Sequence, residues 1–320
     1  MSRQIRWGIL GCARIARTQV VPAILRRSDE ARLAAVASRD PAKLAEFHSL
    51  FGDFTGHASY EALIGDPAID VVYIPLPNSL HCAWAVQAMR AGKHVLCEKP
   101  LALNAREAEE MVRVSRECGV RLMEACMYRY TERMSKVGEI LASGVLGPIR
   151  CINSTFRFFL DRENTIKEKP ELGGGALYDV GCYPLNLIGL VAQSEPEAVA
   201  VECARPRGVD VNLSAVLRYA DGLIATLHCG FDAFGRNYSE IVGRNGALLV
   251  PDTFLDDAGQ ITLLTPKETR QIAVAQSDRY GEEIRDFCAA ILENRAPRLT
   301  LDESLRNMRV LDRLREAIHG

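Results

Sequence analysis

Several features that mark particular classes of protein are missing from this sequence. The 39 Lys and Arg residues nearly balance the 41 Asp and Glu residues, and the formal net charge is only -2. There is no basic stripe and no run of like charges. Binding to nucleic acid or to an anionic membrane surface depends on clustered positive charge, so we expect neither kind of partner.

Long apolar runs and the pattern of a secretory signal are also missing. The chain begins MSRQIRWGIL, where a short apolar run leads directly into a glycine motif, without the cleavage site of a signal peptide. No stretch reaches the ~18 consecutive apolar residues that suggest a membrane span. The 10 cysteines include no C-x-x-C pair, and neither they nor the 6 histidines form a cluster. We therefore expect reduced thiols in a cytoplasmic protein and no metal site.

What the sequence does contain is a regular alternation of strand and helix patterns in its first part. The predicted strands cover residues 5–10, 33–37, 70–74, 94–97 and 121–125. The predicted helices cover residues 20–28, 41–51, 79–91 and 105–118, with a short one near Glu61. Such alternation predicts an α/β fold, a Rossmann-type doubly wound parallel sheet, at residues 1–124.

The remaining residues, 125–320, follow a different pattern. The predicted helices lie at 132–142, after the three glycines at 173–175, and at 279–294 and 302–318. Residues 198–264 show successive strands separated by turn signals, which is typical of an antiparallel sheet. Because 320 residues are many for one hydrophobic core, we predict a second, α+β domain for substrate binding and oligomer contacts. Its last helices could pack back on the first domain.

A dinucleotide-binding turn is the first candidate site, at GILGCARIA (residues 8–16) between the first strand and the first helix. Such a turn needs small residues where the chain bends, where the backbone meets the pyrophosphate and where the helix packs on the strand. Gly11, Ala13 and Ala16 occupy these places, although an ordinary strand–helix turn would look similar. The candidate cofactor-binding residues here are Gly11, Cys12, Ala13, Arg14 and Ile15.

The end of the second predicted strand distinguishes between the two nicotinamide cofactors. NAD sites place a carboxylate there for the ribose 2′-hydroxyl, whereas NADP sites place neutral and basic groups there for the 2′-phosphate. This strand ends in Ser38 and Arg39, which can donate a hydrogen bond and neutralise a phosphate. Asp40 is ambiguous, but before Pro41 it is more typical of a helix cap, and Arg39 could also be a solvated surface charge. The sequence favours NADP(H) over NAD(H).

Two further motifs carry candidate catalytic residues. Glu98 and Lys99 follow an apolar strand, at the edge where α/β sheets bind ligands. Asp179 and Tyr183 lie four residues apart in a predicted helix, so their side chains share one face. A phenol beside a lysine charge is a suitable proton donor to a sugar alkoxide, and a carboxylate can orient either group. Structurally, Asp179 could instead interact with the helix dipole and Tyr183 could be a buried aromatic.

The order of these motifs resembles the glucose–fructose oxidoreductase / inositol dehydrogenase family. It runs GILGCARIA, PLPNSLH (residues 75–81), CEKP (97–100) and GGGALYDVGCYP (173–184). The resemblance implies a Rossmann domain followed by a large, open-faced, mainly antiparallel sheet that often forms dimer or tetramer contacts. It makes Lys99, Asp179 and Tyr183 the catalytic candidates. It adds Pro75, Leu76, Asn78, His81, Glu98 and Lys99 to the cofactor site, although His81 could equally be a structural helix residue.

The likeness is to one part of this family. Inositol dehydrogenases carry His where this chain has Tyr183 and an acidic residue near Ser38. The chain is more similar to NADP-dependent members that carry Tyr: sugar 3-ketoreductases, dihydrodiol dehydrogenases and xylose dehydrogenases. We expect an oxidoreductase that moves hydride between NADP(H) and a carbonyl or secondary alcohol of a sugar or cyclic polyol. A dihydrodiol or aldose 1-dehydrogenase is the alternative, and an NADP-binding redox sensor is a third, although a sensor needs no catalytic residues.

The implied mechanism assigns one role to each catalytic candidate. Tyr183 would protonate the developing alkoxide, Lys99 would stabilise it, and Asp179 would position Lys99 or the substrate. Between residues 156 and 170 lie Arg157, Arg162, Lys167 and Lys169. These could reach a phosphate or nucleotide on the substrate, or form a solvated basic loop. Apolar runs at 214–217 and 223–227 predict that an outer sheet face joins copies of the chain as a homodimer or homotetramer.

Overall fold

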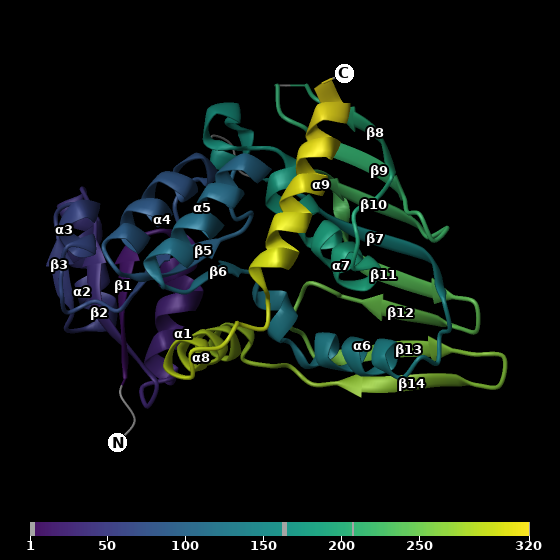
Figure 1. Cartoon of the computed structure of the whole chain (residues 1–320), viewed down its shortest axis with the longest axis horizontal. Coiled ribbons are helices and arrows are strands. Elements are labelled where there is room, and N and C mark those ends of the chain that lie inside the picture. The colour runs from purple at the N-terminus through teal and green to yellow at the C-terminus, as the bar shows by residue number, and fades with distance from the viewer. Residues whose placement is uncertain (1–3, 162–164, 207, 320) are drawn as a thin grey trace. The chain divides into compact units, whose positions relative to one another are not determined.

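The computed structural model describes residues 4–161, 165–206 and 208–319, and the chain divides into two compact units (Figure 1). The first unit combines the residues up to Met127 with Asp278–Leu301, and the second combines Tyr128–Ser277 with the residues from Asp302 onward. A segment near the C-terminus thus returns to the first unit.

The first unit is built on a six-stranded sheet in which all strands are parallel, ordered β3-β2-β1-β4-β5-β6. The strands are β1 (Ile5–Leu10), β2 (Ala31–Ala37), β3 (Thr55–His57), β4 (Val71–Ile74), β5 (His94–Glu98) and β6 (Leu122–Ala125). This strand order is that of dinucleotide-binding folds and confirms the predicted Rossmann sheet. The short β3 was not predicted, because its sequence TGH has no apolar pattern.

The helices of the first unit begin and end largely where the sequence predicts. They are α1 (Val21–Arg26), α2 (Pro41–Phe51), α3 (Tyr60–Ile64), α4 (His81–Arg90), α5 (Ala105–Cys118) and α8 (Arg279–Leu292). Asn104 caps α5 by accepting a hydrogen bond from the Glu107 amide, and Gly119 ends it in the left-handed conformation, as their residue types predict. A π-helical turn at Ala16–Val20 precedes α1.

Helix α8 belongs to the core of the first unit although it is distant in sequence. Tyr280, Ile284 and Phe287 are spaced to form one helix face and are buried in the same cluster as β1 and α1. The Phe287 ring meets the edge of Trp7 on β1 with 5.9 Å between ring centroids. The apolar face of α8 therefore completes the cover of the sheet.

The second unit contains an eight-stranded, mainly antiparallel sheet, ordered β14-β13-β12-β11-β7-β10-β9-β8, as predicted for this domain. Within this eight-stranded sheet, the β10–β7 pair is the only parallel one among the described strands. The strands are β7 (Ile149–Phe159), β8 (Ala198–Ala204), β9 (Asn212–Arg218), β10 (Ile224–Gly230), β11 (Asp232–Gly243), β12 (Ala247–Pro251), β13 (Gly259–Leu264) and β14 (Thr269–Val274). Strand β7, a central strand that precedes the predicted strand region by many residues, was not predicted.

Helices α6 (Glu132–Ala142), α7 (Cys182–Ala192) and α9 (Leu301–His319) complete the second unit. On β9 the residues alternate in burial, with Leu213, Ala215 and Leu217 buried and the side chains between them exposed. One face of the sheet is therefore covered and the other is open. The segment Pro170–Ala192 is long and apolar enough to cross a membrane, but 72% of its apolar window is buried, as in a core helix.

Candidate active site

The predicted dinucleotide turn follows β1 in the first unit. Gly11 has φ +88°, and its amide donates to the carbonyl of Ala37 at 2.8 Å. A Cβ at this position would lie 3.2 Å from Tyr60 Oη and 3.4 Å from Leu76 Cδ2. Only glycine adopts this backbone conformation without strain. Cys12, Ala13, Arg14 and Ile15 follow at least partly exposed, so the turn fits a cofactor pyrophosphate.

Tyr60 is a residue of this region that sequence reasoning missed. It belongs to α3, and its ring meets that of Trp84 edge-on, with 5.0 Å between centroids. Burial raises the pKa of Tyr60, and the positive charge of Arg39 opposes that effect. The phenol therefore lies near both Gly11 and Arg39. No local pattern could reveal it, because the contact joins three separate segments.

The end of β2 has the chemistry expected for a 2′-phosphate. Asp40 caps α2, since its Oδ1 accepts from the amides of Ala42 at 3.0 Å and Lys43 at 3.4 Å, which confirms the predicted cap. Ser38 is 8% exposed, and its Oγ accepts from the Asp40 amide at 3.1 Å. Arg39 is exposed. The carboxylate is thus engaged by the helix, leaving a hydroxyl and a guanidinium for the ligand.

Cys12 of the dinucleotide turn lies against the Ser38 side chain at the end of β2. Burial raises the pKa of Cys12, and a hydrogen bond with the Ser38 side chain acts in the opposite direction. A thiol that stays protonated is a poor nucleophile. Its contact with Ser38 joins the dinucleotide turn to the end of β2.

The loop that carries Lys99 is held by several hydrogen bonds. The Leu101 amide donates to Glu124 Oε1 at 3.0 Å, and the Lys99 amide lies 3.4 Å from Glu98 Oε2. His81 Nδ1 lies 2.9 Å from the Pro100 carbonyl oxygen. Lys99 itself is partly exposed. The loop at the carboxyl end of β5 is therefore held by contacts with Glu124, Glu98 and His81.

His81 connects this loop with the segment at residues 75–81, which the family resemblance assigns to the cofactor site. The side chain is 0% exposed, and its Nε2 lies 2.8 Å from the carbonyl oxygen of Leu76. Burial lowers the pKa of His81, although the carbonyls that face its two nitrogens favour the protonated ring. Pro75 and Leu76 are also buried, whereas Asn78 is partly exposed. The imidazole thus contacts backbone on both sides.

In the second unit, the three-glycine run brings distant groups close to the start of a helix. A Cβ on Gly174 would lie 2.6 Å from the Lys167 carbonyl oxygen, and one on Gly175 would lie 2.1 Å from Asp210 Oδ1. Asp210 Oδ2 accepts from the Leu177 amide at 2.6 Å. Burial, the largest cause, raises the pKa of Asp210 to about 6. Sequence reasoning missed Asp210, which lies between β8 and β9.

Asp179 lies in a π-helical turn, Leu177–Gly181, directly before α7. Its carboxylate forms a short ion pair with Lys167. The Lys167 ammonium also lies 5.0 Å from the centroid of the Phe158 ring and 5.6 Å from that of Phe231, within reach of a cation–π interaction. Lys167 is therefore paired with the candidate residue Asp179 and packed near two aromatic rings, and it is not simply a solvated charge.

The other basic residues of this segment have different surroundings. Arg157 donates from Nε to the Phe234 carbonyl at 3.0 Å, and Lys169 is exposed. Arg162 lies outside the described residues.

Tyr183 is the second residue of α7 and is 6% exposed. Its ring packs among Tyr128, Phe156 and Phe254, with centroids 5.9, 5.4 and 5.7 Å away. This aromatic cluster holds the phenol in one orientation. The second unit thus brings Asp179 and Tyr183 together on one helix, while Lys99 and the cofactor candidates belong to the first unit.

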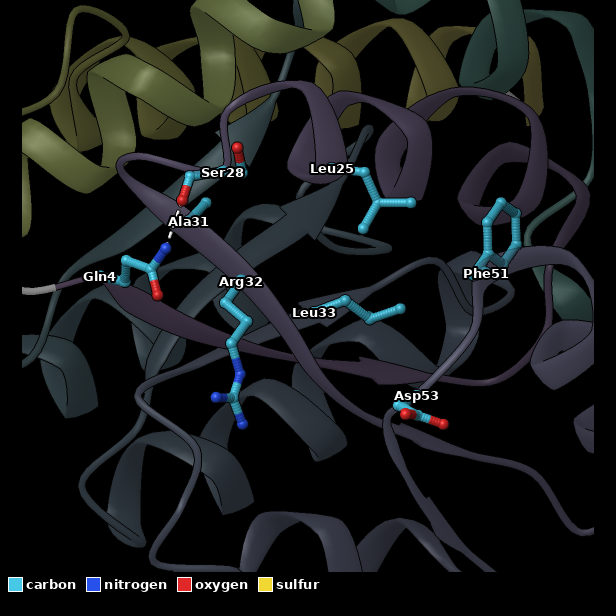
Figure 2. A pocket seen from close by; sticks show the side chains of 8 residues that line it. All are labelled: Gln4, Leu25, Ser28, Ala31, Arg32, Leu33, Phe51 and Asp53. Atoms are coloured by element: carbon cyan, nitrogen blue, oxygen red, sulfur yellow. Dashed lines mark hydrogen bonds between the residues drawn. The ribbon is translucent and has the colours of Figure 1, made fainter.

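A separate pocket of about 400 Å³ in the first unit contains none of these residues (Figure 2). It is lined by Gln4, Leu25, Ser28, Ala31, Arg32, Leu33, Phe51 and Asp53. These residues lie at the amino end of β2, opposite Ser38 and Arg39. Ligands of such sheets bind at the carboxyl ends of the strands, so this pocket is not the candidate active site.

Groups of metal-ligating side chains and disulfide bonds are the two remaining kinds of site to consider. Across residues 4–161, 165–206 and 208–319, no three His, Cys, Asp or Glu side chains are grouped as metal ligands would be. All 10 cysteines are free.

Comparison with known proteins identifies the family. Residues 5–126 match a model described as an oxidoreductase family with an NAD-binding Rossmann fold, and residues 134–249 match the GFO/IDH/MocA C-terminal domain. D-xylose 1-dehydrogenase (NADP(+)) 2 of Haloferax volcanii is 36% identical over 97% of this chain and 96% of its own. The dTDP-3,4-didehydro-2,6-dideoxy-alpha-D-glucose 3-reductase of Actinomadura kijaniata is 34% identical over 97% of this chain and 95% of its own.

The fold of a solved relative agrees with this match. A 3-ketoreductase from Actinomadura kijaniata, in complex with NADP and TDP-benzene, superposes with a TM-score of 0.91. The two chains are 32% identical over 98% of each. Matched along nearly its whole length, the chain belongs to the glucose–fructose oxidoreductase / inositol dehydrogenase family of oxidoreductases.

Proposed function

We propose that this protein is an NADP(H)-dependent oxidoreductase acting on a carbonyl or secondary alcohol of a sugar. The observation that carries the cofactor choice is at the end of β2. Asp40 directs its carboxylate to the start of α2, which supports Ser38 and Arg39 as the groups that would receive a 2′-phosphate. The xylose dehydrogenase relative is NADP-dependent by name, and the solved 3-ketoreductase contains NADP.

NADP(H), when bound, would supply or accept the hydride. Around it we assign the turn from Gly11 to Ile15 to the pyrophosphate and Ser38 with Arg39 to the 2′-phosphate. The loops at Pro75–Asn78 and at Glu98–Lys99 are assigned to the nicotinamide end. His81 would hold these two loops together, because its buried ring contacts the carbonyl oxygens of Leu76 and Pro100.

Proton transfer is assigned to Tyr183, with Lys99 stabilising the developing alkoxide. The packed aromatic cluster around Tyr183 supports this role, because a proton donor must be held in a fixed orientation. Solved structures of the Actinomadura reductase include one with a lysine replaced by alanine and one with a tyrosine replaced by phenylalanine.

Asp179 is assigned to the substrate rather than to Lys99. Its carboxylate is paired with Lys167 in the second unit, and this pairing supports a role in which Asp179 would accept from a sugar hydroxyl. A carboxylate held in this way accepts a hydrogen bond from a neutral polyol and favours one of its orientations.

The substrate class is tested by a turnover screen with NADP(H) and NAD(H) against nucleotide-linked keto sugars, free aldoses and cyclic diols. The named relatives act on a dTDP-linked keto sugar, on D-xylose and on trans-1,2-dihydrobenzene-1,2-diol. Turnover with NADP(H) on at least one of these classes is expected. Purified protein that binds NADP(H) and turns over none of them would contradict the proposal and favour a redox sensor.

We further propose a homodimer or homotetramer joined through the open face of the second unit's sheet. That face carries partly exposed apolar side chains such as Val216 and Ile224. Light scattering at micromolar concentration should return a multiple of the 35.3 kDa chain mass, and a monomer would contradict it. The 10 free thiols fit a reducing, cytoplasmic location.

A further inference from the structure

The phenol of Tyr183 has a second tyrosine as its neighbour. Tyr128 is 0% exposed and belongs to a short 3-10 helix, Met127–Tyr130. Its ring meets the Tyr183 ring edge-on, at an interplanar angle of 71°, and meets the Phe254 ring at 83°. Two phenols are thus packed together in one buried cluster of the second unit, and the proposed function uses only one of them.

The hydroxyl of Tyr128 is held by Asn186 of α7. It donates to Asn186 Oδ1 at 2.6 Å, and Nη1 of Arg129 donates to the same oxygen at 3.2 Å. A guanidinium can only donate hydrogen bonds, so the atom that Arg129 faces is the amide oxygen. The Tyr128 hydroxyl faces this oxygen as well and must be a donor. Its proton is therefore directed at Asn186.

Arg129 extends the same set of contacts to α9. Its Nη2 donates to Glu303 Oε1 at 3.2 Å, and the Arg129 side chain is only 7% exposed. The buried guanidinium is thus paired with a carboxylate while it also donates to Asn186. Because Arg129 is a second donor to Asn186 Oδ1, this oxygen keeps a partner when the Tyr128 hydroxyl is removed.

Tyr128 contacts α7 at two points. Asn186 lies three residues after Tyr183, so the two side chains are neighbours on the helix surface. The Tyr128 ring meets one of them and the Tyr128 hydroxyl meets the other. Ring contacts are favourable over a range of separations, whereas a hydrogen bond fixes a distance and a direction. The bond to Asn186 therefore determines where the Tyr128 ring lies against Tyr183.

We propose that Tyr128 is a positioning residue: its hydrogen bond to Asn186 holds the Tyr183 phenol in the orientation for proton transfer, and Tyr183 alone donates the proton. A proton donor must lie within hydrogen-bond distance of its acceptor, and a misplacement of about 1 Å can cost about 100-fold in rate. The proposal rests on the proposed function for its effect on turnover. The orientation of the Tyr183 phenol is measurable without it.

The orientation is tested by NMR without cofactor or substrate. Tyrosine labelled with ¹³C at Cζ, the carbon that bears the hydroxyl, should give one narrow Tyr183 resonance, identified by its loss in Tyr183→Phe. Tyr128→Phe keeps the ring and removes the hydroxyl, so the Tyr183 resonance should broaden or split. The matched control, Tyr219→Phe, changes another buried tyrosine of the second unit and should leave the resonance narrow. An equally narrow resonance in Tyr128→Phe would overturn the proposal.

The effect on catalysis is tested with a substrate that the protein turns over. Tyr128→Phe should lower kcat about 3- to 10-fold, the range that corresponds to one hydrogen bond, with little change in KM. The affinity for NADP, measured by calorimetry, should not change. In a Tyr183→Phe background the same substitution should lower kcat no further, because the hydroxyl that it positions is absent. Tyr219→Phe should leave kcat within about 2-fold in both backgrounds.

The two backgrounds separate positioning from a purely structural role. A structural role would lower kcat by the same factor whether or not Tyr183 keeps its hydroxyl. That result, or an unchanged kcat in Tyr128→Phe, would overturn the proposal. If the unmodified protein turns over no substrate, the proposed function fails, and the Cζ resonance still decides whether Tyr128 holds the Tyr183 phenol.

Discussion

Asp210 offers a quantitative test of how the helix that carries Asp179 and Tyr183 begins. Burial raises the pKa of Asp210 from its usual 3.8 to about 6. At 1.36 kcal/mol per unit this corresponds to about 3 kcal/mol. Because the folded-state pKa is raised, the folded protein binds the proton more tightly than the unfolded chain does. The resulting stabilisation is fully present below about pH 4 and is lost as pH rises through about 6.

Asp210→Asn removes this titration and keeps an oxygen that can accept from the Leu177 amide. The amide oxygen of Asn can still accept from Leu177, as Asp210 Oδ2 does at 2.6 Å. The variant should therefore match the unmodified protein near pH 4 and exceed its stability by up to about 3 kcal/mol at pH 7.5. For a chain of this size each kcal/mol corresponds to about 2–4 °C in melting temperature.

The assay is thermal unfolding followed by circular dichroism at pH values from 4 to 7.5. Glu202→Gln on β8 is the matched control, because it neutralises an exposed acid near the same loop and should show no such pH dependence. A difference between Asp210→Asn and the unmodified protein that stays constant across this range would refute the reasoning. So would a variant that is less stable at pH 7.5.

Two further substitutions test the cofactor and substrate assignments. Arg39→Ala should weaken NADP binding by about 10- to 100-fold in calorimetry, the loss of a charge-assisted hydrogen bond, and leave NAD binding unchanged. The control Arg32→Ala, at the amino end of the same strand, should affect neither, and an equal loss for both cofactors would contradict the assignment. Lys167→Met should release Asp179 from its ion pair and lower kcat/KM about 10-fold or more, mainly through KM. The neighbouring Lys169→Met should be neutral, and unchanged steady-state kinetics in Lys167→Met would exclude Lys167 from the site.

The sequence predicted those parts of the fold that depend on local patterns. Helix α2 begins at Pro41 after its cap Asp40, and α5 runs from Ala105 to Cys118 between its caps Asn104 and Gly119, because capping residues act within one turn. The short β3 and the central β7 escaped prediction. The TGH sequence of β3 has no apolar pattern, and the alternation in β7 is interrupted by the polar run at 153–155. Both are strands because of the neighbours they pair with.

The candidate site was predictable to the same extent. The motifs at Gly11, Lys99 and Tyr183 are contiguous and carry their own chemistry. Residues that support them are far away in the chain, such as Tyr60 above Gly11 and Asp210 at the start of the three-glycine helix.

The central claim, that Lys99 and Tyr183 act on one proton transfer although they belong to different units, is tested by steady-state turnover of single and double variants. Tyr183→Phe keeps the ring in its aromatic cluster and should lower kcat by about 10²- to 10⁴-fold, with NADP affinity unchanged. Lys99→Ala should lower kcat at least as far. The double variant should be no slower than the slower single variant, because the two groups serve the same step. Near-full activity of Tyr183→Phe on the true substrate, or losses that multiply in the double variant, would contradict the account.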